Sequence, residues 1–147
     1  MIKIGIVGFG HWGPNYFRVF NQLEEVRVVA VCDLDKEKLS KIKQKDIKLY
    51  SGIDDMIKFS NIDACIVATP TATHYSVAKK LLESGINLLV EKPLSNSVAH
   101  AEALVNIAMK KKLKLMVGHT FLFNSGINWL KNYVLSKEFG KMFYLYS

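Results

Sequence analysis

Cysteine is scarce in this sequence of 147 residues, which holds only Cys32 and Cys65. A small secreted scaffold stapled by disulfides would carry many more. Both cysteines lie inside apolar runs, which predicts two reduced thiols in a core rather than one structural disulfide. Hydrophobic runs are also short, since none approaches the ~18 residues of a membrane span. The apolar first ten residues are too few and too rich in glycine for a signal peptide. We therefore expect a cytoplasmic protein, neither membrane-bound nor secreted.

Arginine is almost absent, so lysine supplies nearly all of the positive charge in a sequence whose formal net charge is +7. The lysines concentrate between Lys36 and Lys48, where they alternate with acidic and apolar residues at helical spacing. That pattern is typical of a solvated helix face, and the run lacks the interleaved aromatic residues of a nucleic-acid binder. We therefore expect no nucleic-acid partner. A basic domain does suit small anionic ligands.

Half of the residues are hydrophobic and 22% are charged, which fits one globular domain with its own core. Short β-branched runs alternate with amphipathic stretches of helical length, a pattern that predicts a parallel sheet with crossover helices. The predicted strands are Ile2–Val7, Val26–Cys32, Ile47–Tyr50, Ala64–Ala68, Asn87–Val90 and Leu113–Val117. The predicted helices are Pro14–Leu23, Lys36–Lys45, Asp54–Phe59, Tyr75–Glu83 and Val98–Lys111. Several strands are apolar on both faces, so we predict a doubly wound α/β fold.

The last part of the chain has a different character. Residues 121–139 show a helical pattern rich in large apolar side chains, and Lys141–Ser147 is predicted to be a strand. A terminal strand with large apolar side chains and no partner is an exposed sheet edge, which proteins avoid. We therefore expect a dinucleotide-binding Rossmann domain over residues 1–120. Residues 121–147 would then be a connecting helix and the first strand of a second α+β domain, with the parent protein continuing beyond Ser147.

A G-x-G-x-x-G pattern opens the chain directly after a predicted strand and before a predicted helix. Gly8 permits the tight turn, Gly10 lets the backbone approach a pyrophosphate, and Gly13 allows the helix and strand to pack closely. The helix N-terminus offers free N–H donors to phosphates, and Pro14 suits its first turn. The alternative is a plain glycine-rich turn. The predicted pyrophosphate site comprises Gly8, Phe9, Gly10, His11, Trp12 and Gly13.

Asp33 follows Gly13 by 20 residues and ends the second predicted strand. That is the place of the carboxylate that accepts hydrogen bonds from the adenosine ribose hydroxyls and repels the extra phosphate of NADP. NAD is therefore favoured over NADP, although Lys36 and Lys38 would offset some of the repulsion. In the alternative interpretation, Asp33 or Asp35 only caps the following helix, and both roles are compatible.

Three stretches resemble one known family: GFGHWGPN at the start, ATPTATHYSVAKKLLESG in the middle, and VEKPLS shortly after. Together they resemble the N-terminal domain of the Gfo/Idh/MocA oxidoreductases, in particular the branch that acts on nucleotide-linked sugars or sugar acids. The resemblance places Thr69, Pro70 and His74 beside the cofactor. From the residue alone, His74 is more typical of a helix entry than of a catalyst.

The resemblance also assigns a role to Glu91-Lys92-Pro93, which follows the fifth predicted strand. In the family this lysine contacts the nicotinamide ribose and the substrate hydroxyl, so Lys92 is the predicted catalytic residue, with Glu91 orienting it at the cofactor site. A lysine ammonium stabilises a developing alkoxide or relays a proton. Without the resemblance, the tripeptide would be an ion pair beside a turn. His119 either lines the substrate side or is structural.

The predicted function is an NAD-dependent oxidoreductase that transfers hydride between nicotinamide and a secondary alcohol of a sugar or nucleotide-linked sugar. The alternative is a dinucleotide-binding module without catalysis, for which Lys92 would be superfluous. No metal site is predicted, because the four histidines show no paired ligand spacing. The expected partners are a small sugar substrate and further copies of the protein, bound through the second domain.

Overall fold

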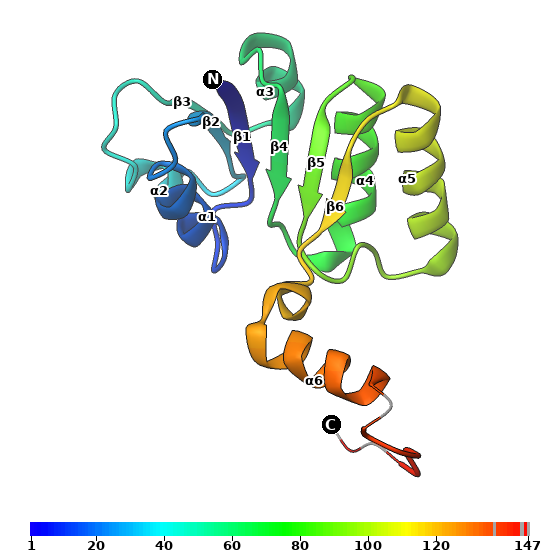
Figure 1. The fold of residues 1–147 in the computed structure, drawn as a ribbon. Helices are drawn as coiled ribbons and strands as arrows, with labels where there is room; N and C mark the ends of the chain where they lie inside the picture. Colours follow the sequence, from blue (N-terminus) through cyan, green and yellow to red (C-terminus); the bar gives the residue numbers. More distant parts are fainter. Residues whose placement is uncertain (137, 145, 147) are drawn as a thin grey trace.

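The protein folds around one six-stranded parallel sheet, with the strand order β3-β2-β1-β4-β5-β6 (Figure 1). The structure is a computed structural model and describes residues 1–136, 138–144 and 146. The strands are β1 (Ile2–Val7), β2 (Val26–Cys32), β3 (Lys48–Tyr50), β4 (Ala64–Val67), β5 (Asn87–Val90) and β6 (Leu115–Val117). This order reverses direction at β1, so the predicted doubly wound α/β fold is confirmed.

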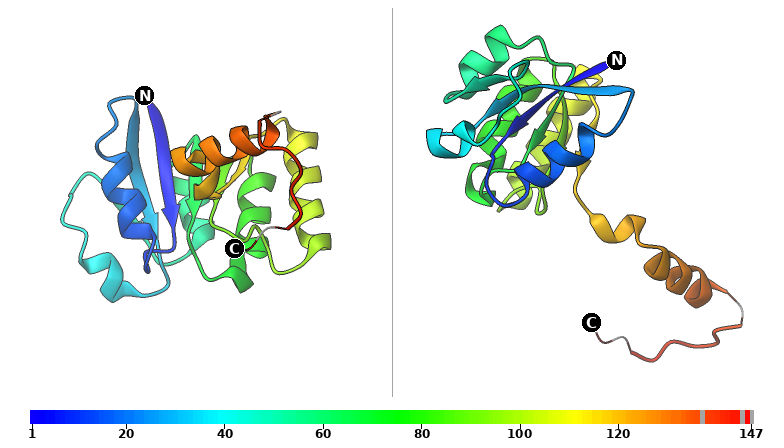
Figure 2. Two further views of the ribbon diagram at one scale, coloured as in Figure 1. Left: turned by 60° about the horizontal axis from the view of Figure 1, so that its bottom comes forward. Right: turned by 90° about the vertical axis from the view of Figure 1, so that its left-hand side faces the viewer.

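Helices cover both faces of the sheet. Helices α1 (Gly13–Phe20) and α2 (Lys36–Ser40) pack on one face, where Phe17 and Leu39 join a buried apolar cluster. Helices α3 (Ile53–Phe59), α4 (Thr71–Glu83) and α5 (Val98–Lys111) pack on the other face in a second cluster (Figures 1 and 2). The sheet therefore lies between two apolar layers, and the loops at the carboxyl ends of its strands remain free to build a site.

The predictions for the strands of the sheet hold to within two residues, whereas among the helices α2 and α4 differ most from the predicted bounds and α1 ends at Phe20 rather than Leu23. Strands β1, β2 and β5 have the predicted bounds. Helix α4 begins at Thr71 rather than Tyr75. Pro70 directly precedes it, and the proline ring fixes φ at −58°, a value compatible with a helix start, four residues before the predicted apolar pattern begins. Helix α2 ends at Ser40 rather than Lys45. Leu39 is the one buried residue of α2, so little apolar burial stabilises a longer helix through the lysine-rich run.

Both cysteines are free and buried, as predicted. Cys32 lies in β2 and Cys65 in β4, on the two strands that flank β1. Burial raises the pKa of the Cys32 thiol to about 11, and it also raises the pKa of the Cys65 thiol. Both side chains are therefore neutral members of the core at physiological pH.

A 3₁₀ helix (Thr120–Phe123) and helix α6 (Ser125–Leu135) follow β6 and extend away from the sheet (Figures 1 and 2). The helical prediction for residues 121–139 is thus correct in part. The strand predicted over Lys141–Ser147 is wrong for Lys141–Tyr144 and Tyr146, which are in no strand; residues 145 and 147 lie outside the described part. A strand needs a neighbour for its backbone hydrogen bonds, and no described strand lies beside this segment.

Across the described part of the chain, no helix has both the length and the apolar character needed to cross a membrane.

Candidate functional site

The glycine turn between β1 and α1 is packed as the sequence pattern predicts. Gly8 has φ +93°, and a Cβ there would come within 2.6 Å of the Ala68 backbone. A Cβ on Gly13 would lie 2.2 Å from the carbonyl oxygen of Gly8, so only glycine lets α1 approach the strand this closely. A Cβ on Gly10 would meet nothing within 4 Å. Gly8 and Gly13 therefore shape the turn, and Gly10 leaves open the space in front of it.

The Gly13→Ala substitution is expected to lower the free energy of unfolding by roughly 3 kcal/mol, the upper end of the cost of overpacking, because backbone must move to admit the methyl group. Urea unfolding followed by circular dichroism measures this loss. The matched control is Gly10→Ala, which adds the same atom where space is open and is expected to leave stability nearly unchanged. Equal stability of the two variants would contradict this account of the turn.

A cleft of about 620 Å³ opens beside this turn at the carboxyl edge of the sheet. It brings together seven of the predicted site residues: Gly8, Gly10, His11, Trp12, Asp33, Thr69 and Pro70. The remaining lining residues are Val7, Cys32, Leu34, Asp35, Lys38, Ile53, Ala68, Thr73 and Val77. The cleft thus joins the ends of β1, β2 and β4, which is where an open α/β sheet binds its ligands.

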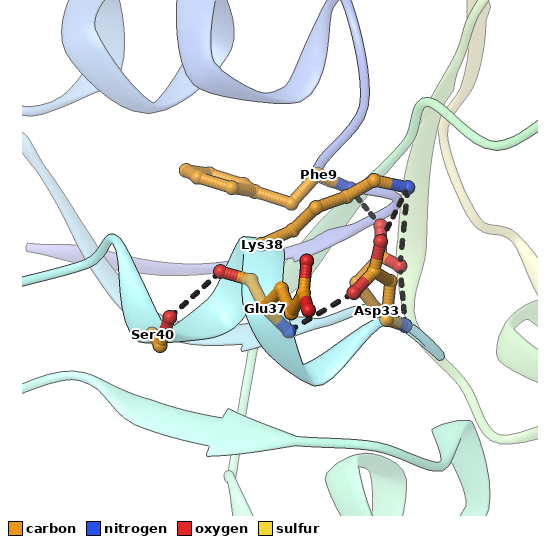
Figure 3. A network of polar contacts seen from close by, with 6 residues as sticks. Phe9, Asp33, Glu37, Lys38 and Ser40 are labelled. Carbon is orange, nitrogen blue, oxygen red and sulfur yellow. Dashed lines mark hydrogen bonds and ion pairs between the residues drawn. The ribbon is translucent and has the colours of Figure 1, made fainter.

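Asp33 is held in a fixed orientation at the rim of this cleft (Figure 3). The backbone N–H of Phe9 donates to one carboxylate oxygen at 2.6 Å, and the backbone N–H of Asp35 donates to the other at 2.8 Å. Lys38 places its ammonium 3.8 Å from Asp33 and 3.6 Å from Asp35. The side chain of Asp33 is 11% exposed and lines the cleft; each oxygen accepts one backbone N–H, and a carboxylate has capacity for further donors.

Asp35 caps α2, because its side chain accepts a hydrogen bond from the N–H of Glu37 at 2.9 Å. The two acids therefore divide the roles that the sequence left open: Asp35 caps the helix, and Asp33 lines the cleft. Of the two lysines weighed for the ribose end, the one that reaches Asp33 is Lys38.

Phe9 and His74 were predicted at the cofactor site, but neither is among the residues that line the cleft. Phe9 packs its ring edge-on against Phe17 in the core and contributes its N–H to Asp33. His74 is 1% exposed, and its two ring nitrogens lie 2.8 Å from the carbonyl oxygens of Thr69 and Pro93. His74 therefore links the loop after β4 to the turn after β5, and its ring does not line the cleft.

Glu91 and Lys92 follow β5, two strands away from the glycine turn in the sheet. The Glu91 side chain is buried, with the whole residue 7% exposed, and one of its oxygens accepts the backbone N–H of Lys92 at 3.0 Å. Its other oxygen accepts the hydroxyl of Tyr16, in α1, at 2.5 Å. Glu91 thus orients the main chain of Lys92; the described ion pairs include none between its carboxylate and the Lys92 ammonium.

A second cavity of about 380 Å³ contains Lys92. The other lining residues are Gly118, His119, Thr120, Phe121, Leu122 and Ile127. His119 therefore shares a cavity with Lys92, which favours the substrate-side interpretation of this histidine over a purely structural one. The two cavities lie at the ends of the neighbouring strands β4 and β5, on the same edge of the sheet.

Several residues of the site were not found from the sequence, among them Leu34, Ile53 and Tyr16. Leu34 and Ile53 give the cleft apolar walls, and Tyr16 binds Glu91. The one sequence signal for Leu34 is its place directly after Asp33; in the structure the residue is 88% exposed. No local pattern identifies Tyr16, whose partner lies 75 residues away.

The donor set fits a dinucleotide. Gly10 leaves the approach to the turn free, and the first turn of α1 carries no acidic side chain to repel phosphate. Asp33 offers acceptors for ribose hydroxyls, and Leu34, Ile53 and Val77 offer apolar surface for a base. The residues present therefore match the groups of NAD.

Comparison with known proteins agrees with this geometry. The chain is 30% identical over 147 residues to the 2,7-anhydro-N-acetylneuraminate hydratase of Mediterraneibacter gnavus, covering 99% of this chain and 39% of that protein. It is 25% identical over 131 residues to the UDP-N-acetylglucosamine 3-dehydrogenase of Acidithiobacillus ferrooxidans, covering 88% of this chain and 41% of that protein. The chain thus spans roughly two fifths of the length of these curated relatives.

Solved structures share the fold. The WlbA dehydrogenase of Bordetella pertussis, in complex with NADH and UDP-GlcNAcA, matches with a TM-score of 0.89 and 24% identity over 95% of this chain and 43% of that one. The scyllo-inositol dehydrogenase of Lactobacillus casei, with NAD(H) and scyllo-inositol, matches with a TM-score of 0.86 and 23% identity over 96% and 43%. A family model described as "Oxidoreductase family, NAD-binding Rossmann fold" matches residues 2–119. The chain therefore belongs to the Gfo/Idh/MocA family of oxidoreductases, as its NAD-binding Rossmann domain.

Proposed function

We propose that this chain is the cofactor-binding part of an NAD-dependent enzyme that transfers hydride between nicotinamide and a secondary alcohol of a sugar or nucleotide-linked sugar. One observation carries the proposal: a cleft with a glycine turn and Asp33 lies on the same sheet edge as a cavity that contains Lys92. A module that only binds the dinucleotide has no use for an ammonium in the second cavity.

The chain's residues divide the work along this edge. The N–H groups at the start of α1 bind the pyrophosphate, and Asp33 accepts hydrogen bonds from the adenosine ribose. Bound NAD supplies the hydride acceptor. Lys92 would donate a hydrogen bond to the substrate oxygen and stabilise its negative charge, while the hydroxyl proton passes to solvent and the hydride passes from the carbon to the cofactor. His119 and Thr120 line the same cavity and offer further polar contacts to a hydroxylated substrate.

The substrate class follows from the cavity and from the relatives. The cavity of Lys92 is lined by the polar residues Lys92, His119 and Thr120 together with the apolar Phe121 and Leu122, a combination that suits a sugar ring. Dehydrogenases of UDP-N-acetylglucosamine and of inositol are among the matches. The same proposal includes a domain boundary near residue 120, a second domain beyond it, and assembly into a homo-oligomer through that second domain. The two reduced, buried thiols are consistent with a cytoplasmic location.

A second candidate is conversion of a sugar derivative without net oxidation, because one relative is named a hydratase. The two outcomes separate in a single assay that follows both substrate loss and NADH formation. Dehydrogenation gives one NADH per substrate consumed, whereas net hydration gives product with no lasting NADH.

Calorimetric titration tests the cofactor assignment. The wild-type chain is expected to bind NADH at least ~10-fold more tightly than NADPH, about 1.4 kcal/mol, because the Asp33 carboxylate accepts the ribose hydroxyls and repels a 2′-phosphate. Asp33→Ser is expected to weaken NADH binding and to narrow or reverse this preference, because the substitution leaves the Lys38 ammonium free for the phosphate. The control is Asp46→Ser, whose partner Arg27 lies outside the cleft. Equal wild-type affinities for NADH and NADPH would overturn the role of Asp33.

A further inference from the structure

The hydroxyl of Tyr16 makes a contact that the cofactor chemistry leaves unexplained. Tyr16 lies in the first turns of α1, directly after the glycine turn, and it donates to the Glu91 carboxylate at 2.5 Å. Helix α1 follows β1, Glu91 follows β5, and β4 lies between those two strands. This hydrogen bond therefore spans one intervening strand and joins the two halves of the candidate site.

The second oxygen of the Glu91 carboxylate binds the backbone of Lys92, the proposed catalytic residue. This oxygen accepts the backbone N–H of Lys92 at 3.0 Å, while the backbone N–H of Glu91 donates to Val67 at 2.9 Å. The residue is 7% exposed, so these bonds form away from competing water. The position of the Lys92 main chain thus depends on a carboxylate whose other anchor is Tyr16.

Gly118, directly after β6, packs against both Tyr16 and Glu91. A Cβ on Gly118 would lie 3.3 Å from the Tyr16 hydroxyl and 3.5 Å from the nearer Glu91 carboxylate oxygen. Gly118 also lines the cavity of Lys92. Burial and the neighbouring carboxylate raise the pKa of Tyr16, so the phenol remains a donor at physiological pH.

We propose that Tyr16 and Glu91 are a positioning pair, which sets the Lys92 turn relative to the glycine turn and transmits cofactor binding at α1 to Lys92. The inference rests on the proposed function, in which NAD binds at the glycine turn and Lys92 faces the substrate. Tyr16 is not among the residues that line either cavity. Its effect is exerted through Glu91 on the main chain that carries Lys92.

Backbone amide NMR of the chain with Tyr16→Phe, which removes one oxygen, tests the pair. The Lys92 amide is expected to exchange with solvent at least ~10-fold faster than in the wild type, since hydrogen bonds to charged groups are among the stronger ones. Saturating NADH is expected to change the chemical shift of the Lys92 amide, and in Tyr16→Phe this change is expected to be at most half of that in the wild type. Exchange at Val28 and Val31, in the core of β2, is expected to stay unchanged.

Two further variants keep the test decisive. Tyr75→Phe is the matched control, because within the described part of the chain the Tyr75 hydroxyl makes no hydrogen bond and its ring stacks on His100. Glu91→Gln is expected to loosen the Lys92 amide as Tyr16→Phe does, and the double variant is expected to be no worse than Glu91→Gln alone. Should Tyr16→Phe fold poorly, the Glu91→Gln result decides.

The outcomes separate the two proposals. If NADH binds both proteins and moves the Lys92 amide equally in wild type and Tyr16→Phe, the positioning pair is refuted while the proposed function stands. If NADH does not bind the wild type, the proposed function itself fails.

Discussion

Gly10→Val is expected to raise the dissociation constant for NADH at least ~100-fold, about 2.8 kcal/mol, while the fold survives. Gly10 lines the cleft, and a Cβ there meets no protein atom within 4 Å. The φ angle of Gly10 is not positive, so valine fits the backbone. Its methyl groups then occupy the space through which phosphate must approach the backbone N–H groups.

Circular dichroism and calorimetry on the same samples separate lost binding from lost structure. The matched control is Gly52→Val, because Gly52 has an extended backbone at φ −141° and its Cβ would meet only Asp55 at 4.0 Å. It lies outside the cleft lining and is expected to bind NADH normally. A folded Gly10→Val protein with wild-type affinity would show that the pyrophosphate binds elsewhere.

Lys92→Ala is expected to lower kcat by roughly 10²- to 10⁴-fold, the usual contribution of a general acid or base. The enzyme to be assayed is the proposed full-length protein of the relatives' size, which carries this chain as its cofactor-binding part. Affinity for NADH is expected to change by less than ~5-fold, because the proposed contacts to the pyrophosphate and the adenosine ribose lie in the first cleft and only the nicotinamide end lies toward Lys92. The loss is therefore expected in chemistry rather than in cofactor binding.

Steady-state kinetics with the alcohol substrate and a parallel NADH titration measure the two effects separately. Lys79→Ala is the matched control, because that lysine lies on α4 and pairs with Glu83 at 3.9 Å, away from both cavities. Full activity of Lys92→Ala would remove this residue from the mechanism and leave Glu91-Lys92-Pro93 as a structural turn.

The parts of the molecule that the sequence predicts correctly are those with a local cause. Strands β1, β2 and β5 have the predicted bounds because burial on both faces demands continuous apolar runs, and such runs are visible in the sequence. The glycine turn is visible as a pattern within six residues, although only the close approach of Gly13 to Gly8 is local; Gly8 is restricted by the backbone of Ala68 at the end of β4. Asp33 follows from its distance along the chain to that turn.

The parts that were missed depend on distant partners. Tyr16 pairs with a carboxylate 75 residues away. The contacts of His74 with the carbonyl oxygens of Thr69 and Pro93 were likewise not visible in the sequence, and its place beside the cofactor stays a prediction. The expected strand over Lys141–Ser147 is not seen in the described residues of that segment, because pairing depends on a neighbouring strand and not on β-propensity alone. Helix α2 is shorter than predicted, and Leu39 is its one buried residue, so little apolar burial stabilises the helix itself.

A crystal structure of the chain with NADH is the most direct test of the central claim, that one sheet edge binds the dinucleotide across both cavities. The account predicts pyrophosphate against the backbone at Gly10, adenosine ribose hydroxyls on Asp33, and the nicotinamide end toward Lys92. Pyrophosphate bound away from the glycine turn, or a ribose without contact to Asp33, would contradict it.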